Sequence, residues 1–341
     1  MIKVTGSRAS SILYNWLVCN RIQGAAIIPA NICETVPAAY YKAGLQVFFC
    51  DIEPDTFQPQ KREIENLIAQ FEGKCVLHYN HTYGASLVND KHFITKIKKD
   101  YPNVIIVDDQ CLCVPDQWQV KTEADLSLYS TGKTKVVDLN FGGFAFMPDK
   151  WTYQPTVINY NPKCFELFEE HIKECHRNNQ KVSKEILVSD WIENETKVQE
   201  NYFEQIRRKL KESLEHKKQI NSIYSTLQGS MGMEYQNWRY NILVENQAEC
   251  LKALFDNNLF ASFHYKSLGE GYFEDTKTPI CNWLENHVIN LFNDFHYSES
   301  QASKTVEILK RVSIPVKEDS WRGKSNDIGG RTPSSTCNKE S

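Results

Sequence analysis

Residues that could carry out one kind of chemistry together stand near the middle of the chain. Lys135 follows Ser130 by five positions, and Ser130 ends a short apolar run. Upstream, another apolar run leads directly into Asp108 and Asp109. A lysine amine can form a Schiff base with an aldehyde, and a carboxylate can hold a pyridine nitrogen protonated. This order of residue types supplies what a pyridoxal phosphate enzyme needs.

The start of the chain offers groups that could hold the phosphate of such a cofactor. Gly6 allows close approach of the backbone, and Ser7 is the expected N-cap of a helix over Ser10–Cys19. The N-terminus of a helix presents free N–H groups and the positive end of its dipole. Ser130 would add a hydroxyl. An ordinary capped helix explains Gly6 and Ser7 equally well.

The chain resembles the DegT/StrS-type sugar aminotransferases, a branch of the fold-type I pyridoxal phosphate enzymes in the aspartate aminotransferase superfamily. The resemblance extends from about Thr5 to about Val312 and depends on the order and spacing of short motifs. The matching stretches are Thr5–Ala9, Ile27–Pro29, Ala43-Gly44, Asp51-Ile52, Tyr83-Gly84, Val107–Asp109, Tyr129-Ser130 with Lys135, and Gly142-Gly143.

The resemblance implies roles for individual residues. It selects Lys135 as the Schiff-base lysine over Lys133, which stands two residues earlier. Adjacent strand residues point to opposite faces, so Asp108 and Asp109 compete as the partner of the ring nitrogen, and the resemblance selects Asp109. It assigns Gly6, Ser7 and Ser130 to the cofactor phosphate. It places Cys33 over the face of the ring.

Two positions depart from the family pattern. Relatives commonly carry an aromatic residue where Cys33 stands, and Gln or His where Leu112 stands. The matched region also begins close to the start of the chain, so the N-terminal arm of many relatives is expected to be short or absent. These departures keep open a catalytically silent regulatory or assembly protein. A sugar dehydratase is a further alternative, although its known relatives carry histidine in place of Lys135.

The reaction that the resemblance implies is transamination. An amino acid, with glutamate as the expected donor, would pass its amino group to a keto sugar linked to a nucleotide. Relatives with these motifs are homodimers whose subunits share residues near the active sites, so a homodimer is expected here.

Composition limits the other function classes. The formal net charge of −4 argues against a general nucleic-acid binder. No apolar stretch is long enough to span a bilayer, and the N-terminus lacks the pattern of a secretory signal, so no membrane association is expected. The 11 cysteines in 341 residues favour a reducing cytoplasm over a disulfide scaffold. The spacing of Cys111 and Cys113 is not that of a zinc site, and no metal is expected.

The first 150 residues alternate between short apolar runs and longer amphipathic stretches. This alternation predicts an α/β fold with a mainly parallel sheet that helices cover on both faces. The expected strands are Ala25–Pro29, Val47–Ile52, Cys75–Tyr79, Val104–Val107, Leu126–Ser130 and Phe144–Met147. The expected helices are Ser10–Cys19, ahead of the first strand, and then Glu34–Ala43, Lys61–Phe71 and Lys91–Asp100.

The second half changes character and predicts a smaller α+β domain. Charged amphipathic stretches at Phe165–His176 and Glu200–Leu227 come first. Strand-like and helix-like patterns then alternate in Tyr240–Val244, Cys250–Asn257, Phe260–Tyr265 and Ala302–Val312. The predicted divisions are a large cofactor-binding domain at 1–160, a helical connection at 161–235, a small C-terminal domain at 236–314 and a disordered tail at 315–341.

Overall fold

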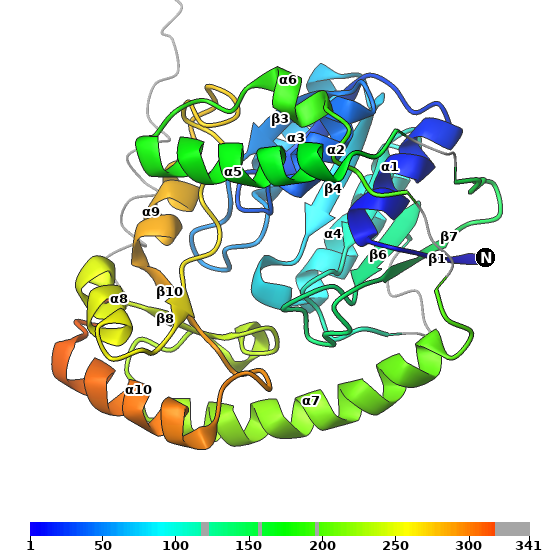
Figure 1. Ribbon diagram of the computed structural model, residues 1–341. Helices are drawn as coiled ribbons and strands as arrows, with labels where there is room; N and C mark the ends of the chain where they lie inside the picture. Colours follow the sequence, from blue (N-terminus) through cyan, green and yellow to red (C-terminus); the bar gives the residue numbers. More distant parts are fainter. Residues whose placement is uncertain (117–122, 156–158, 195–197, 318–341) are drawn as a thin grey trace, which may run out of the picture.

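The computed structural model describes residues 1–116, 123–155, 159–194 and 198–317. Two sheets organise these residues, a seven-stranded sheet in the first half and a three-stranded sheet in the second. Figure 1 shows the long helix α7 (Tyr202–Tyr224) running along one edge of the molecule from the first sheet to the second.

The seven-stranded sheet is mainly parallel, as predicted. Its strand order is β1-β7-β6-β5-β4-β2-β3. Strands β2 to β6 run parallel to one another, whereas β7 and β1 are antiparallel to their neighbours. The strands are β1 Ile2–Gly6, β2 Ala25–Pro29, β3 Gln46–Cys50, β4 Cys75–Asn80, β5 Ile105–Asp109, β6 Leu126–Ser130 and β7 Gly143–Met147.

The start of the chain differs from the prediction. The first element is β1, which pairs with β7 from Ile2 opposite Met147 to Gly6 opposite Gly143. The expectation that a helix precedes the first strand is therefore wrong. Ile2–Gly6 is short and mixes polar with apolar residues, so the sequence alone gives little sign that it pairs with a strand about 140 residues later.

The N-cap of helix α1 (Ala9–Cys19) lies one residue later than expected. Arg8 occupies the N-cap position with extended backbone angles, φ −149° and ψ 155°, and makes no side-chain capping bond. The predicted N-cap role of Ser7 is therefore wrong. The hydroxyl of Ser7 instead donates to the carbonyl of Asn194 at 3.2 Å.

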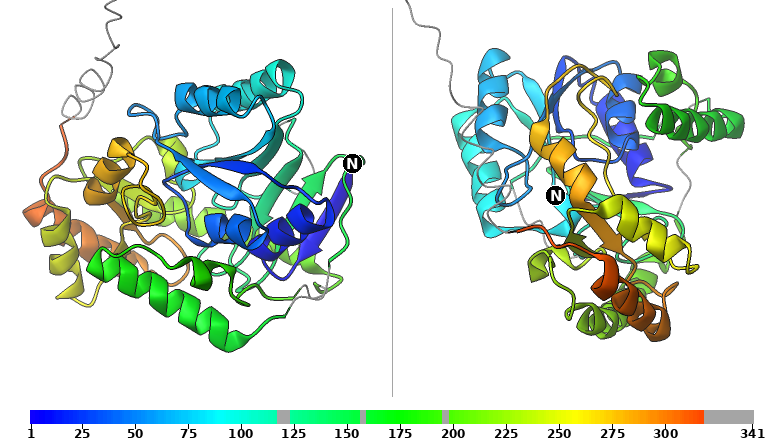
Figure 2. Two further views of the ribbon diagram at one scale, coloured as in Figure 1. Left: turned by 90° about the horizontal axis from the view of Figure 1, so that it is seen from above. Right: turned by 90° about the vertical axis from the view of Figure 1, so that its left-hand side faces the viewer.

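Helices cover both faces of the large sheet because its central strands are apolar on both sides. Along β2, Ala26 and Ile28 pack into one cluster, whereas Ala25 and Ile27 pack into another. The right-hand view of Figure 2 shows α3 and α4 on one face, and α1 and α2 on the other with α5 and α6 outside them. These helices are α2 Thr35–Lys42, α3 Lys61–Gln70, α4 Val88–Asp100, α5 Pro162–Asn178 and α6 Lys184–Val188.

The second half folds around an antiparallel sheet with the order β8-β10-β9. Its apolar core joins β8 and β10 to the C-terminal half of α7 and to α8 and α10. Strand β9 covers only two residues of the predicted Phe260–Tyr265, while α9 and β10 were not predicted. The elements are β8 Tyr240–Leu243, α8 Gln247–Phe255, β9 Ala261–Ser262, α9 Pro279–His287, β10 Val288–Leu291 and α10 Glu299–Val312, with 3₁₀ turns η1 Thr82–Gly84 and η2 Met233–Tyr235.

The domain boundaries stay predictions, but the chain makes ordered contacts beyond Ile314. Pro315 forms a bridge with Val244, and the Val316 N–H donates to the carbonyl of Leu243 at 3.2 Å. Residues 318–341 of the predicted tail lie outside the described residues. Among the helices that the structure describes, none has both the length and the apolar character needed to span a bilayer.

A pair of glycines tests how tightly the loop after β5 is packed. Gly84 has a φ of +82°, and a Cβ there would lie 2.1 Å from the carbonyl oxygen of Leu112. Gly44 has a similar φ of +86° with nothing within 4 Å of such a Cβ. Gly44→Ala should cost about 1 kcal/mol of backbone strain, and Gly84→Ala roughly 3 kcal/mol or more, because it also displaces backbone. Urea unfolding of the two variants measures the difference, and equal losses would contradict this packing.

Candidate active site

A cavity of about 260 Å³ opens where the parallel strands β4, β5 and β6 end. The carboxyl ends of neighbouring parallel strands share one edge of a sheet, so side chains distant in sequence meet there. The cavity wall also includes the N-terminus of α1, the segment before α2 and the loop between β6 and β7. Four of the sequence-predicted site residues line it, namely Lys135, Asp109, Ser130 and Cys33.

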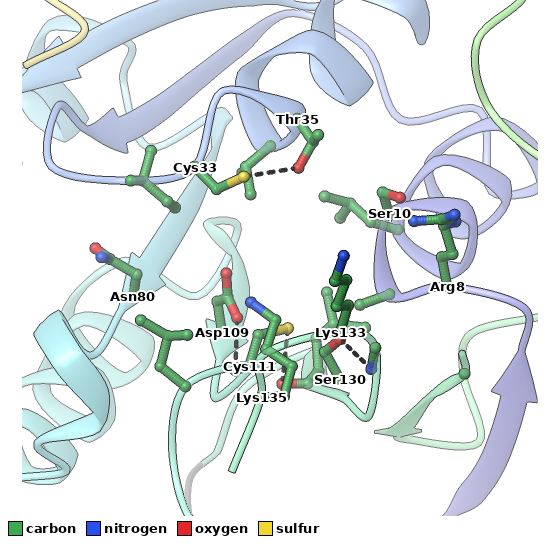
Figure 3. Close-up of a pocket in the computed structure, with 18 of the residues that line it drawn as sticks. Arg8, Ser10, Cys33, Thr35, Asn80, Asp109, Cys111, Ser130, Lys133 and Lys135 are labelled. Carbon is green, nitrogen blue, oxygen red and sulfur yellow. Dashed lines mark hydrogen bonds between the residues drawn. The ribbon is translucent and has the colours of Figure 1, made fainter. Parts of the chain in front are cut away.

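Both candidate lysines line the cavity, but they lie in different parts of it. Figure 3 shows the amine of Lys135 beside Asp109 and Cys111, and the amine of Lys133 nearer to Ser10. The charge of Lys135 also acts on the thiols of Cys33 and Cys111. Lys135 is therefore the lysine that lies next to the carboxylate.

Asp109 is a buried carboxylate held in its ionised form. Its Oδ2 lies 3.1 Å from His78 Nε2, and its Oδ1 accepts a 2.8 Å hydrogen bond from the Cys111 N–H. Burial raises the pKa of Asp109, but His78 and the Cys111 N–H outweigh that effect and lower the pKa to about 2. Asp109 can therefore keep the nitrogen of a pyridine ring protonated at neutral pH.

His78 connects Asp109 to a second buried side chain. His78 Nδ1 lies 3.1 Å from the hydroxyl of Tyr40 on α2. The strand register places His78 opposite Val107 and Asn80 opposite Asp109, so His78 and Asp109 are diagonal neighbours on one face of the sheet. Sequence analysis missed His78, although a histidine inside an otherwise apolar strand next to the aspartate-bearing strand could have indicated it.

Asp108 does not line the cavity and pairs with a different histidine, His81, which does. Its Oδ1 lies 2.7 Å from His81 Nε2, and its Oδ2 accepts a 2.9 Å hydrogen bond from Gln110. Burial lowers the pKa of His81, but the carboxylates of Asp108 and Asp90 outweigh it and raise that pKa to about 9. The resulting imidazolium neutralises the charge of Asp108. The two adjacent aspartates therefore pair with different histidines, Asp108 with His81 and Asp109 with His78.

Gly6 and Ser7 do not line the cavity. Gly6 is the last residue of β1, and Ser7 is buried with its hydroxyl bonded to Asn194. The cavity wall in this part of the chain is formed by Arg8, Ala9 and Ser10. At the N-terminus of α1, the cavity is therefore lined by residues that come shortly after the predicted Gly6 and Ser7.

The N-terminus of α1 can hold an anion. It has no side-chain cap and no acidic residue in its first turn. Ser130, at the end of β6, accepts the Gly132 N–H at 3.3 Å through its Oγ, and its own O–H can donate. An amine at Lys135, an ionised carboxylate at Asp109 and a helix N-terminus without a side-chain cap suit an aldehyde, a pyridine nitrogen and a phosphate. The residues present therefore fit pyridoxal phosphate.

The two positions that depart from the family pattern both line the cavity. Cys33 Sγ lies 3.2 Å from the hydroxyl of Thr35, and Leu112 shares the cavity wall with Asp109. Burial raises the pKa of the Cys33 thiol, and it raises that of Cys111 well above the usual value. Both sulfurs are therefore protonated at neutral pH and pack as small apolar groups.

Residues from the second half also line the cavity, and sequence analysis missed them. The Arg8 guanidinium pairs with Glu193 at 2.8 Å and lies 5.2 Å from the centre of the Phe165 ring. Trp191 and Tyr265 complete this part of the wall. Nothing in the local sequence connects Phe165 or Trp191 with the N-terminal helix, because only the folded chain brings them together.

Solved structures with the same fold include several aminotransferases. A DegT/DnrJ/EryC1/StrS aminotransferase from Brucella abortus is 14% identical, with a TM-score of 0.64 over 91% of this chain and 86% of that one. The sugar aminotransferase CalS13 from Micromonospora echinospora is 14% identical, with a TM-score of 0.61 over 91% and 87%. An E. coli GDP-4-keto-6-deoxy-D-mannose-3-dehydratase with bound hydrated pyridoxal phosphate is 13% identical, with a TM-score of 0.58 over 91% and 87%.

These identities are low, so the structural likeness shows the fold alone. No curated protein matches the sequence. A family profile gives the stronger result, because it matches residues 6–310 and so includes all strands of both sheets except most of β1, and every residue that lines the cavity. The chain belongs to the DegT/DnrJ/EryC1/StrS aminotransferase family.

Proposed function

We propose that this protein is a sugar aminotransferase that moves an amino group from an amino acid, expected to be glutamate, to a keto sugar linked to a nucleotide. The observation that carries the proposal is the meeting of Lys135 with the ionised Asp109 in one cavity. The cofactor of this family is pyridoxal phosphate, and the cavity residues suit it.

Pyridoxal phosphate, when bound, supplies an aldehyde that combines with primary amines and a ring that accepts electrons from a neighbouring C–H bond. Lys135 would contribute the resident amine, then take a proton from the substrate Cα and return one during amino transfer. Asp109 would hold the proton on the ring nitrogen. His78, hydrogen-bonded to Asp109 and to Tyr40, would keep that carboxylate ionised and fixed in direction.

The remaining cavity residues would orient the cofactor. The hydroxyls of Ser130 and Ser10, which line the cavity, and the N-terminus of α1 would bind the phosphate. Gly6 and Ser7 would act through the backbone that leads into α1. Cys33 would pack beside the ring as an apolar group, leaving more room than an aromatic side chain would.

The part of the cavity that Arg8, Phe165 and Trp191 line supports an extended, charged acceptor. Phe165 and Trp191 line it with aromatic rings, and Arg8 offers a cation whose present partner is Glu193. Aromatic faces suit sugar and base rings, and a guanidinium suits phosphate. A nucleotide-linked sugar carries all three groups.

The two lysines give the first test of this function. Lys135→Ala should abolish both the borohydride-fixed cofactor adduct and amino transfer, because it removes the amine beside Asp109. Lys133→Ala should retain the adduct. Mass spectrometry of tryptic peptides after borohydride reduction identifies the modified residue. An adduct on Lys133 in the native protein would contradict the assignment, and an adduct on Lys135 without amino transfer to any keto sugar would favour the catalytically silent alternative.

The two aspartates give a matched comparison. Asp109→Asn should lower the rate of proton transfer by roughly 10²–10³, since charge-stabilising groups in active sites contribute on the order of 3–4 kcal/mol to the barrier. Asp108→Asn should leave turnover of the folded protein largely unchanged, because Asp108 faces His81 and not the cavity. Stopped-flow spectroscopy of the half-reaction with an amino acid measures both rates. The reverse pattern would transfer the role to Asp108.

The same variants should differ in how their stability depends on pH. The pKa of His81 is raised in the folded protein from 6.5 to about 9, so its pairing with Asp108 stabilises the fold fully below pH 6.5 and less as pH rises through 9. The stability advantage of the native protein over Asp108→Asn should therefore shrink from pH 6.5 to 9. The advantage over Asp109→Asn should not change there, because Asp109 titrates near pH 2. Urea unfolding across this range measures both differences.

We further expect a homodimer with an obligate interface on the order of 2,000 Å² or more. This expectation comes from the family, whose members share residues across a two-fold axis. Sedimentation velocity of the active protein tests it, and a monomer with full activity would contradict it.

A further inference from the structure

The loop that carries Lys135 is held from outside by two side chains of the second half of the chain. The indole N–H of Trp238 donates to the carbonyl of Thr134 at 2.7 Å. The hydroxyl of Ser213, on α7, donates to the carbonyl of Val136 at 2.6 Å. These two carbonyls belong to the residues on either side of Lys135, so one donor acts on each side of the lysine.

The backbone of this loop needs such support. Thr134 has a φ of +64°, a left-handed conformation that a β-branched residue rarely adopts. Strained backbone of this kind persists only where surrounding contacts fix it. Within the loop, Asp138 accepts the N–H groups of Thr134 at 2.7 Å and Asn140 at 2.8 Å. The bonds from Ser213 and Trp238 add anchors that do not move with the loop.

Trp238 is itself rigidly placed. Its side chain is buried, and its ring lies nearly parallel to those of Tyr83 and Tyr265, with centroids at 6.1 and 6.3 Å. Its carbonyl accepts a 2.8 Å hydrogen bond from the buried amine of Lys217. Tyr83 comes from the turn after β4, whereas Tyr265 lines the cavity. The indole N–H therefore has a fixed direction.

Ser213 is equally constrained. It lies on the buried face of α7, a helix of 23 residues whose first turns also pack against β6 and β7 through Tyr202 and Ile206. A hydroxyl on such a helix has little freedom to follow a moving loop. The two anchors therefore come from two separate rigid elements, α7 and the segment that leads into β8.

We propose that Ser213 and Trp238 are positioning residues that fix the backbone on both sides of Lys135 and so hold its amine beside Asp109. This inference rests on the proposed function, because the position of the amine matters only if Lys135 carries the cofactor. Neither residue lines the cavity. Both act through the peptide groups of the loop.

Three variants test the proposal. Trp238→Phe keeps an aromatic ring in the stack but removes the donor. Ser213→Ala removes the other donor, and Ser213→Thr restores a hydroxyl. Trp151→Phe is the matched control, since the Trp151 indole donates to Asp125 at 3.0 Å and does not line the cavity.

The first measurement is hydrogen exchange by mass spectrometry on the full chain without added cofactor. Peptides that include residues 131–140 should exchange roughly tenfold faster in Trp238→Phe and Ser213→Ala, the effect expected from one lost buried hydrogen bond. Ser213→Thr and Trp151→Phe should match the native protein in this segment.

The second measurement is a pH titration of the visible absorption of the cofactor-loaded protein. The apparent pKa of the cofactor–lysine linkage should shift by about half a unit or more in Trp238→Phe and Ser213→Ala, because it reports the surroundings of the lysine nitrogen. The kcat should fall roughly tenfold with little change in KM for the amino donor, as expected when a reacting group is misplaced.

The outcomes separate this inference from the proposed function. Native exchange and a native titration in a folded Ser213→Ala protein and a folded Trp238→Phe protein would overturn the inference. If Trp238→Phe does not fold, the hydrogen exchange and the pH titration of Ser213→Ala, compared with those of Ser213→Thr, test the inference. If the native protein forms no borohydride-fixed adduct at Lys135, the proposed function fails instead.

Discussion

A buried, ionised carboxylate is the feature on which the candidate site depends. Asp109 lies at the end of a strand with little access to water, where an unpaired charge would be strongly unfavourable. The hydrogen bonds with His78 and with the Cys111 N–H compensate for this burial. They require β4 and β5 in their observed register and the turn after β5 in its observed shape. The ionised state of Asp109 therefore depends on the geometry of the large sheet.

The pair of adjacent aspartates shows how a strand can serve two purposes. Successive side chains of a strand point to opposite faces, so Asp108 and Asp109 cannot share a partner. Asp109 is paired with His78 and faces the cavity, while Asp108 is paired with the charged His81 within the protein. Two histidines three residues apart thus stabilise two carboxylates without bringing both charges into the cavity.

Residues from the second half of the chain, distant in sequence, line the cavity and support the loop that carries Lys135. Trp191 and Glu193 line the cavity together with Arg8, and Ser213 and Trp238 bond to the backbone around Lys135. The large sheet supplies the chemical groups. The later helices and the segment before β8 supply the restraints that hold those groups in place.

The sequence alone determined the parts of this protein that depend on local patterns. Six apolar runs predicted six of the seven strands of the large sheet, because strands buried on both faces must be continuously apolar. Short motifs at fixed spacing indicated the family, and they selected Lys135 and Asp109, both of which lie in the cavity. Strand β1 was missed because it is short and only partly apolar.

The tertiary structure decided what depends on contacts between distant residues. The start of α1 at Ala9, and not after a Ser7 cap, follows from where β1 ends and from the bond between Ser7 and Asn194. The pairing of His78 with Asp109 follows from strand register, and the bonds from Ser213 and Trp238 follow from the path of α7. The local sequence does not indicate such partners, because these hydrogen bonds form only after chain segments that are far apart in sequence have packed together.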